Sequence, residues 1–186
     1  MNAVYGTQKR YSDEVISSGM LRESSAFFLL PRVPANNIKF KYTLECAAFH
    51  AIGVHVLKEA AETGTTVLQT LLRRGEESIC FLVFHSPHNL FCKHYSYRII
   101  AHDAQCETYP YVKYRECGSF PVSVELVIPV APEILNRNIS LLDSDGYRFF
   151  QKKDGAPQYL PNTNMKVIQE ICADIANFII QGGFIS

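Results

Sequence analysis

LECAAFHAIGVHVLKEAAETGTTVLQTLLRR, from Leu44 to Arg74, is the stretch that predicts the centre of the fold. Its middle carries only three charges, at Lys58, Glu59 and Glu62. Apolar residues at helical spacing form one face of this helix: Phe49, Ile52, Val56, Leu57 and Ala60. Its other sides are almost as apolar, because they carry Ala48, Ala51 and Val54. A helix that is apolar around most of its circumference is buried on more than one side. We therefore predict a buried central helix over which a sheet closes.

Segments outside this helix have the patterns of β-strands. Before it, apolar and polar residues alternate from 38 to 44, which predicts a half-buried strand. Lys39 and Lys41 lie on its polar side, which suits a solvent face or a sheet edge. Apolar runs or alternating patterns predict further strands, of which the one near Pro110 is edge-like. These strands span residues 26–30, 79–84, 95–101, 109–115 and 122–130, followed by a hairpin within 147–160.

Two more helices are predicted near the ends of the chain. Ser12 and the acids that follow it indicate a short helix ending near Gly19 or Arg22. The last helix is capped by Thr163 or Asn164 and ends at a pair of glycines. Its apolar face comprises Ile168, Ile171, Cys172, Ile175 and Ile179, and the chain closes with an apolar tail of Phe184 and Ile185.

These elements define an α+β fold. Strands joined by short turns run antiparallel, because a parallel return needs about a dozen residues of crossover. We expect a two-layer fold, in which an antiparallel sheet of about five to seven strands packs on the central helix and on the amphipathic C-terminal helix. The same order of elements occurs in helix-grip folds, which hold apolar ligands, and longin-like and other two-layer folds are nearly as compatible with it. Residues 1–10 are expected to be a flexible arm, and residues 11–186 a single domain.

Composition argues against several classes of protein. Lysine plus arginine equals aspartate plus glutamate at 18 each, whereas nucleic-acid binders usually carry a basic excess or stripe. No apolar run approaches the ~18 residues of a transmembrane helix. The N-terminal residues have no apolar core of a secretory signal. The six cysteines form no CxxC pair, so we expect free thiols and an intracellular protein, cytoplasmic or nuclear.

One loop gathers side chains that could bind a metal. His85, His88, Cys92 and His94 lie within ten residues, on a predicted hairpin between two strands. Imidazole and thiolate are ligands that zinc prefers, and a turn can bring them onto one ion. The spacing matches no standard zinc pattern, so a histidine-rich polar loop is the alternative interpretation.

Catalytic motifs are absent from the sequence. GxSxG, HExxH, Walker and GxGxxG patterns do not occur. Cys46 and His50 share a helical face, but a buried cysteine beside a satisfied histidine explains that pair without nucleophilic chemistry. We therefore favour a protein without catalytic activity over an enzyme, and expect no cofactor apart from a possible zinc ion.

Three functions follow from these observations. The first is a protein–protein interaction domain or adaptor, a subunit of a larger complex, that binds another protein or a second copy of itself through Lys39, Lys41, Phe184 and Ile185. The second is a helix-grip-like carrier of a small apolar ligand, with a cavity between the sheet and the last helix. The third is a zinc-binding module or metal-dependent enzyme that uses the loop of residues 85–94.

Overall fold

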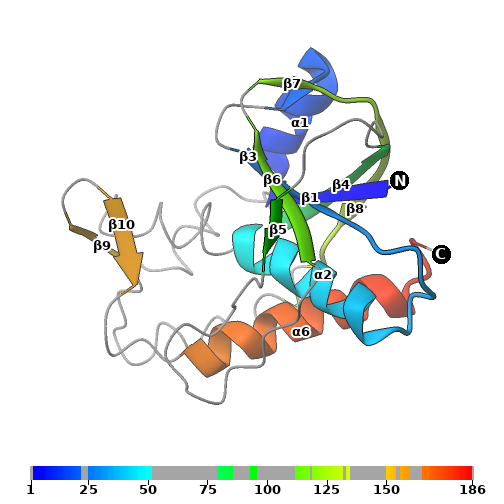
Figure 1. The fold of residues 1–186 in the computed structure, drawn as a ribbon, viewed down its shortest axis with the longest axis vertical. Coiled ribbons are helices and arrows are strands. Elements are labelled where there is room, and N and C mark those ends of the chain that lie inside the picture. Colours follow the sequence, from blue (N-terminus) through cyan, green and yellow to red (C-terminus); the bar gives the residue numbers. More distant parts are fainter. Residues whose placement is uncertain are drawn as a thin grey trace.

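The computed structural model describes residues 2–21, 25–51, 79–85, 93–95, 112–117, 119–131, 133–134, 150–153, 156–159 and 165–185. Its strands are β1 (Asn2–Gln8), β2 (Met20–Leu21), β3 (Ser25–Leu29), β4 (Ile79–His85), β5 (Lys93–Tyr95), β6 (Val112–Cys117), β7 (Phe120–Pro121), β8 (Val124–Pro129), β9 (Phe150–Lys153) and β10 (Ala156–Tyr159). Its helices are α1 (Lys9–Ser18), α2 (Ile38–His50) and α6 (Met165–Gln181). The main sheet has the order β5-β6-β3-β1-β4-β8. Every neighbouring pair in it is antiparallel, so the fold is α+β (Figure 1).

The N-terminal strand β1 lies in the interior of this sheet, between β3 and β4. It pairs with β4 along its whole length, from Asn2 opposite His85 to Gln8 opposite Ile79. The flexible arm predicted for residues 1–10 is therefore wrong, since β1 occupies most of it and Lys9 begins α1. The apolar signal of β1 is short and is followed by Gly6, which made the strand hard to recognise.

Side chains of the inner strands alternate between two buried faces. On one face Val4, Phe28 and Phe81 join the larger core, and on the other Tyr5, Phe27 and Leu82 join the smaller one. The helix α1 packs on the smaller core through Val15, while α2 covers the larger. The two-layer prediction is therefore corrected: helices lie on both faces of the sheet.

Helix α2 starts earlier than the sequence pattern predicts. Asn37 is its N-cap, and the Asn37 side chain accepts a hydrogen bond of 2.9 Å from the backbone N–H of Lys39. The strand predicted for residues 38–44 is wrong, because these residues form the first turns of α2. Phe40, Tyr42 and Leu44 are all buried there. In a helix that is buried on two sides, apolar residues can fall at every second position as well as at helical spacing. An alternating pattern alone therefore does not distinguish such a helix from a strand.

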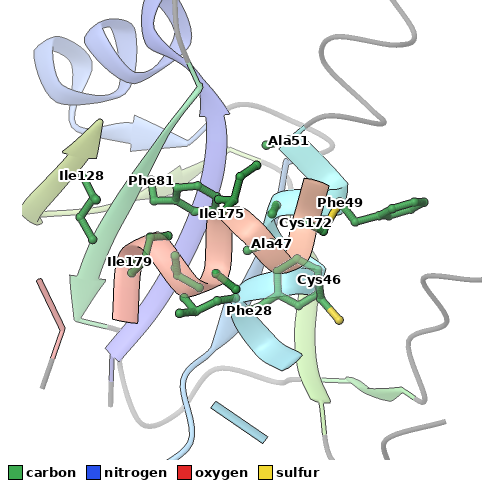
Figure 2. Packing of buried hydrophobic residues seen from close by; sticks show 14 of the residues in the cluster. Phe28, Cys46, Ala47, Phe49, Ala51, Phe81, Ile128, Cys172, Ile175 and Ile179 are labelled. Atoms are coloured by element: carbon green, nitrogen blue, oxygen red, sulfur yellow. The ribbon is translucent and has the colours of Figure 1, made fainter. Parts of the chain in front are cut away.

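The described part of the central helix confirms the prediction of an element buried on several sides. Leu44, Cys46, Ala47, Ala48 and Ala51 are fully buried. Beyond Ala51 the predicted helix lies outside the described residues. Helix α6 packs along α2, and its predicted apolar face is confirmed in Ile171, Cys172, Ile175 and Ile179 (Figure 2).

The remaining strands match the sequence in part. In β8, Leu126 and Ile128 turn inward while Glu125 and Val127 are exposed, which confirms the alternation read from the sequence. The strand β6 lies between β5 and β3 and is not at the edge as predicted. β9 and β10 form the predicted late hairpin, with Lys153 opposite Ala156. Within the described residues, no helix is long and apolar enough to cross a bilayer.

Candidate functional site

A pocket of about 520 Å³ lies where the start of β1 and three other segments of the chain meet. The loop that leaves β3 forms one wall, the first turn of α2 forms another, and the C-terminal tail closes a third. Pockets that hold ligands in proteins have volumes of about 300–1,000 Å³, so this one is large enough to receive a group from a partner. The lining residues are Asn2, Leu30, Pro31, Arg32, Val33, Pro34, Phe40 and Ile185.

The loop wall of this pocket is held by backbone hydrogen bonds. The N–H of Leu30 donates to the carbonyl oxygen of Asn2 over 2.9 Å, which continues the pairing of β3 with β1. The N–H of Val33 donates to Pro31 O over 2.9 Å, and the N–H of Asn37 donates to Pro34 O over 2.8 Å. Proline fixes φ near −65°, so two prolines further restrict the loop. The loop is therefore a defined wall that leads directly into the N-cap of α2.

The tail wall depends on a reversal of the chain after α6. Gly183 has φ of +66°, a left-handed conformation that glycine adopts without a steric penalty. The Phe184 ring then packs against Phe178, with 5.8 Å between ring centroids, and Phe184 stays 40% exposed. Ile185 turns inward, is only 7% exposed and joins the larger core. In the tail, Phe184 is therefore exposed to solvent, whereas Ile185 forms one wall of the pocket.

The described lining of the pocket is mostly apolar and carries one cation. Arg32 is the one charged residue among its described lining residues, and it is exposed. Asn2 adds an amide, and the other lining side chains are apolar. None of these side chains can act as a nucleophile or a general base near neutral pH. The pocket is therefore suited to holding an apolar group beside an anionic or polar one.

The structure separates the four residues expected to bind a partner. Lys39 is exposed on the first turn of α2. Lys41 lies two residues further along the same helix, with its Nζ 3.9 Å from the Glu45 carboxylate. Both lysines are on a helix, so the expected lysine-bearing sheet edge is wrong. Phe184 is exposed as expected, whereas Ile185 is buried and is corrected to a wall of the pocket.

The sheet order argues against a single metal ion bound by all four predicted ligands. His85 ends β4 and His94 lies in β5, so β1, β3 and β6 stand between their strands. Neighbouring strands are ~4.8 Å apart, which puts these two positions roughly 19 Å apart across the sheet. The predicted hairpin between their strands is therefore wrong. His88 and Cys92 lie outside the described residues, and the described residues contain no metal-binding group of three or more histidine, cysteine or acidic residues.

Helices α2 and α6 bring several titratable groups into the core. Burial raises the pKa of the Cys46 thiol well above its usual value, and it raises that of Cys172 as well. Burial lowers the pKa of His50 to about 4, so this imidazole is neutral near pH 7. Burial also raises the pKa of Glu45, and the Lys41 ammonium partly opposes that shift. Neutral thiols with raised pKa values are poor nucleophiles, which fits a structural role for Cys46 and His50.

Sequence reasoning missed the loop wall of the pocket. In the sequence, Pro31 and Pro34 mark only the end of the strand predicted for residues 26–30, and no role is predicted for Arg32. A sharper signal was available, since two prolines flank an arginine immediately before a helix cap at Asn37. A short, restricted loop with a cation is a common setting for binding residues.

No protein-family model, curated protein or solved structure matches this chain.

Proposed function

We propose that this protein is a non-catalytic interaction domain, an adaptor or complex subunit, that binds another protein through the pocket between the β3–α2 loop and the C-terminal tail. The pocket of about 520 Å³ is the observation that carries the proposal. Two large apolar side chains near lining residues in the sequence are exposed: Ile38 is 59% exposed and Phe184 is 40% exposed. Each lies within two residues of a lining residue, Phe40 or Ile185. Exposed apolar groups around a pocket are typical of protein interfaces.

The filled core supports this function over that of an apolar-ligand carrier. A helix-grip carrier needs a cavity between the sheet and the last helix. Side chains that line an internal cavity retain accessible surface, yet Phe81, Ile128, Ile175 and Ile179 are 0–1% exposed (Figure 2). Side chains from the sheet and from α6 therefore fill the described part of this interface, and a ligand-sized space lies instead at the surface pocket.

An intracellular location, cytoplasmic or nuclear, is part of the same proposal. The three cysteines described in full, Cys46, Cys80 and Cys172, are buried free thiols. Free thiols persist in reducing compartments, where disulfides are rare. Buried thiols would survive elsewhere too, so cell fractionation of the tagged protein is the measurement that decides its location.

Site-specific photo-crosslinking tests the interaction function. Benzoylphenylalanine is introduced in place of Ile38 or Phe184 in the full chain and irradiated in the protein's own cells. Ile16 provides the matched control, because it is 49% exposed but lies on α1, at the other face of the sheet. We expect one discrete adduct from positions 38 and 184 that position 16 does not form. An adduct of twice the chain mass would identify a second copy as the partner.

The adduct must then be reproduced with purified components. The partner identified by mass spectrometry should bind the wild-type chain, and Phe184→Ala should weaken this binding about tenfold, as expected when an apolar contact at an interface is truncated. Ile16→Ala should leave the affinity unchanged. If positions 38 and 184 form no adduct, or the same adducts as position 16, the proposed function is wrong.

A further inference from the structure

We propose that the pocket takes an acidic peptide segment, in which a large apolar side chain enters the pocket and a neighbouring aspartate or glutamate pairs with Arg32. This inference rests on the proposed function and specifies the partner's chemistry. Its observations are the charge of the pocket rim, the apolar character of the pocket interior and the extent of the surface around it.

The charge of the rim favours a carboxylate. Arg32 is exposed, and none of the described lining residues is acidic. Within the described part of the chain, Arg32 forms no ion pair of its own, whereas Lys41 is already paired with Glu45. A planar guanidinium offers two parallel N–H donors to a carboxylate, so Arg32 can recognise an acidic side chain with defined geometry.

The interior of the pocket favours an apolar side chain. Leu30, Val33, Phe40 and Ile185 supply aliphatic and aromatic surface from three different segments. Leu30, Phe40 and Ile185 also belong to the larger core, so these walls are fixed before a partner arrives. A preformed apolar pocket avoids the entropic cost of ordering its walls on binding.

The surroundings favour a peptide over a free small acid. Ile38 in the first turn of α2 and Phe184 in the tail are exposed apolar side chains, and each lies within two residues of a lining residue. A small carboxylic acid that fills the pocket would leave these two side chains in water. An extended segment of a partner protein can cover them with residues that flank the anchor.

Selection from a phage library of random peptides tests this inference with the full chain. Wild-type protein should enrich peptides in which a large apolar residue lies next to aspartate or glutamate. Arg32→Glu should instead enrich peptides with lysine or arginine at the acidic position. Lys9→Glu reverses an exposed charge on α1, at the other face of the sheet, and should enrich the same peptides as wild type.

Affinity measurements with a synthetic copy of one enriched peptide sharpen the test. Replacing its acidic residue by the matching amide, or introducing Arg32→Gln into the protein, should weaken binding about tenfold, and combining both changes should add little more. Circular dichroism confirms that each variant is folded.

The outcomes separate this inference from the function on which it rests. Enriched peptides without an acidic bias, or with a bias that Arg32→Glu leaves unchanged, would overturn the inference. Failure to enrich any peptide would do the same. Saturable binding of hexanoate that depends on Arg32, with no peptide enriched, would replace the peptide by a small carboxylic acid. A discrete crosslink from positions 38 and 184 would still support an interaction domain in each of these cases.

Discussion

The carbonyl oxygen of Ala47 lies directly against Gly6, so that a Cβ atom at Gly6 would stand only 2.6 Å from it. Gly6 is in β1 and Ala47 is in α2, and this contact fixes how closely the central helix approaches the sheet. The same Cβ would lie 2.9 Å from the ring of Phe81 and 3.1 Å from the Cβ of Ala51. Glycine is required here by the close approach of two backbones.

Gly6→Ala should therefore destabilise the protein by about 2–3 kcal/mol, because the helix must move away from the strand. Urea titration measures this loss. Gly183→Ala is the matched control: nothing lies within 4 Å of its added Cβ, so only the left-handed backbone at φ +66° is strained. That strain should cost about 1 kcal/mol. Equal losses in the two variants would contradict the close approach of α2 to β1.

Ile175→Ala tests whether α6 belongs to the core. Ile175 is fully buried in the cluster that includes Phe81 and Ala47. Removing its side-chain carbons should leave a cavity and cost about 2–5 kcal/mol. Glu170→Ala, at an exposed position of the same helix, should change the free energy of unfolding by less than about 0.5 kcal/mol. A loss below 1 kcal/mol for Ile175→Ala would mean that α6 does not cover α2.

His50 should make stability depend on pH. Its pKa is lowered to about 4 by burial, against ~6.5 in an unfolded chain. Between pH 4 and 6.5 the unfolded state binds more protons than the folded state. The contribution of His50 to the free energy of unfolding is therefore complete above pH 6.5 and is lost as pH falls towards 4. The loss should reach up to about 3 kcal/mol. His50→Phe keeps an aromatic ring near Phe28, where the ring centroids are 6.2 Å apart, but cannot titrate.

Urea titrations at several pH values between 7.5 and 4 measure this effect as the difference between wild type and His50→Phe. Taking this difference cancels the contributions of other groups to the free energy of unfolding. Glu45 is one of them, because its raised pKa stabilises the folded state as pH falls, whereas His50 destabilises it. A constant difference across this range would show that His50 is solvated in the folded protein.

The buried thiols should resist alkylation. Burial raises the pKa of Cys80 to about 11 and those of Cys46 and Cys172 further, so few thiolates form at pH 8. Iodoacetamide followed by mass spectrometry should modify these three cysteines at least tenfold more slowly in native protein than in urea. Rapid native modification of Cys46 would contradict its full burial on α2.

Sequence patterns predicted the elements that have one dominant period. The apolar run Ile79–Phe84 predicts a buried strand, and the apolar face of α6 predicts an amphipathic helix. Both predictions are confirmed. The first turns of α2 were assigned to a strand because a helix buried on two sides also alternates. The place of β1 inside the sheet depends on long-range pairing with β3 and β4, which local periodicity does not encode.

The candidate site was predictable only in fragments. Phe184 is conspicuous as an apolar residue at the end of the chain, and it is exposed as expected. Ile185 has the same chemistry, but the left-handed turn at Gly183 sends it inward. Arg32 becomes a candidate binding residue only in the folded chain, where the loop, α2 and the tail meet around one pocket. Such convergence of distant segments is a property of the folded chain.

Hydrogen exchange along α2 tests whether this helix is held between the sheet and α6. The pocket depends on that packing, because its lining residues Phe40 and Ile185 belong to the same core. Amides of residues 42–50 should exchange only through global unfolding, as slowly as those of β1 and β4. Exchange of α2 through local opening, orders of magnitude faster than that of β1, would contradict both the fold and the pocket built on it.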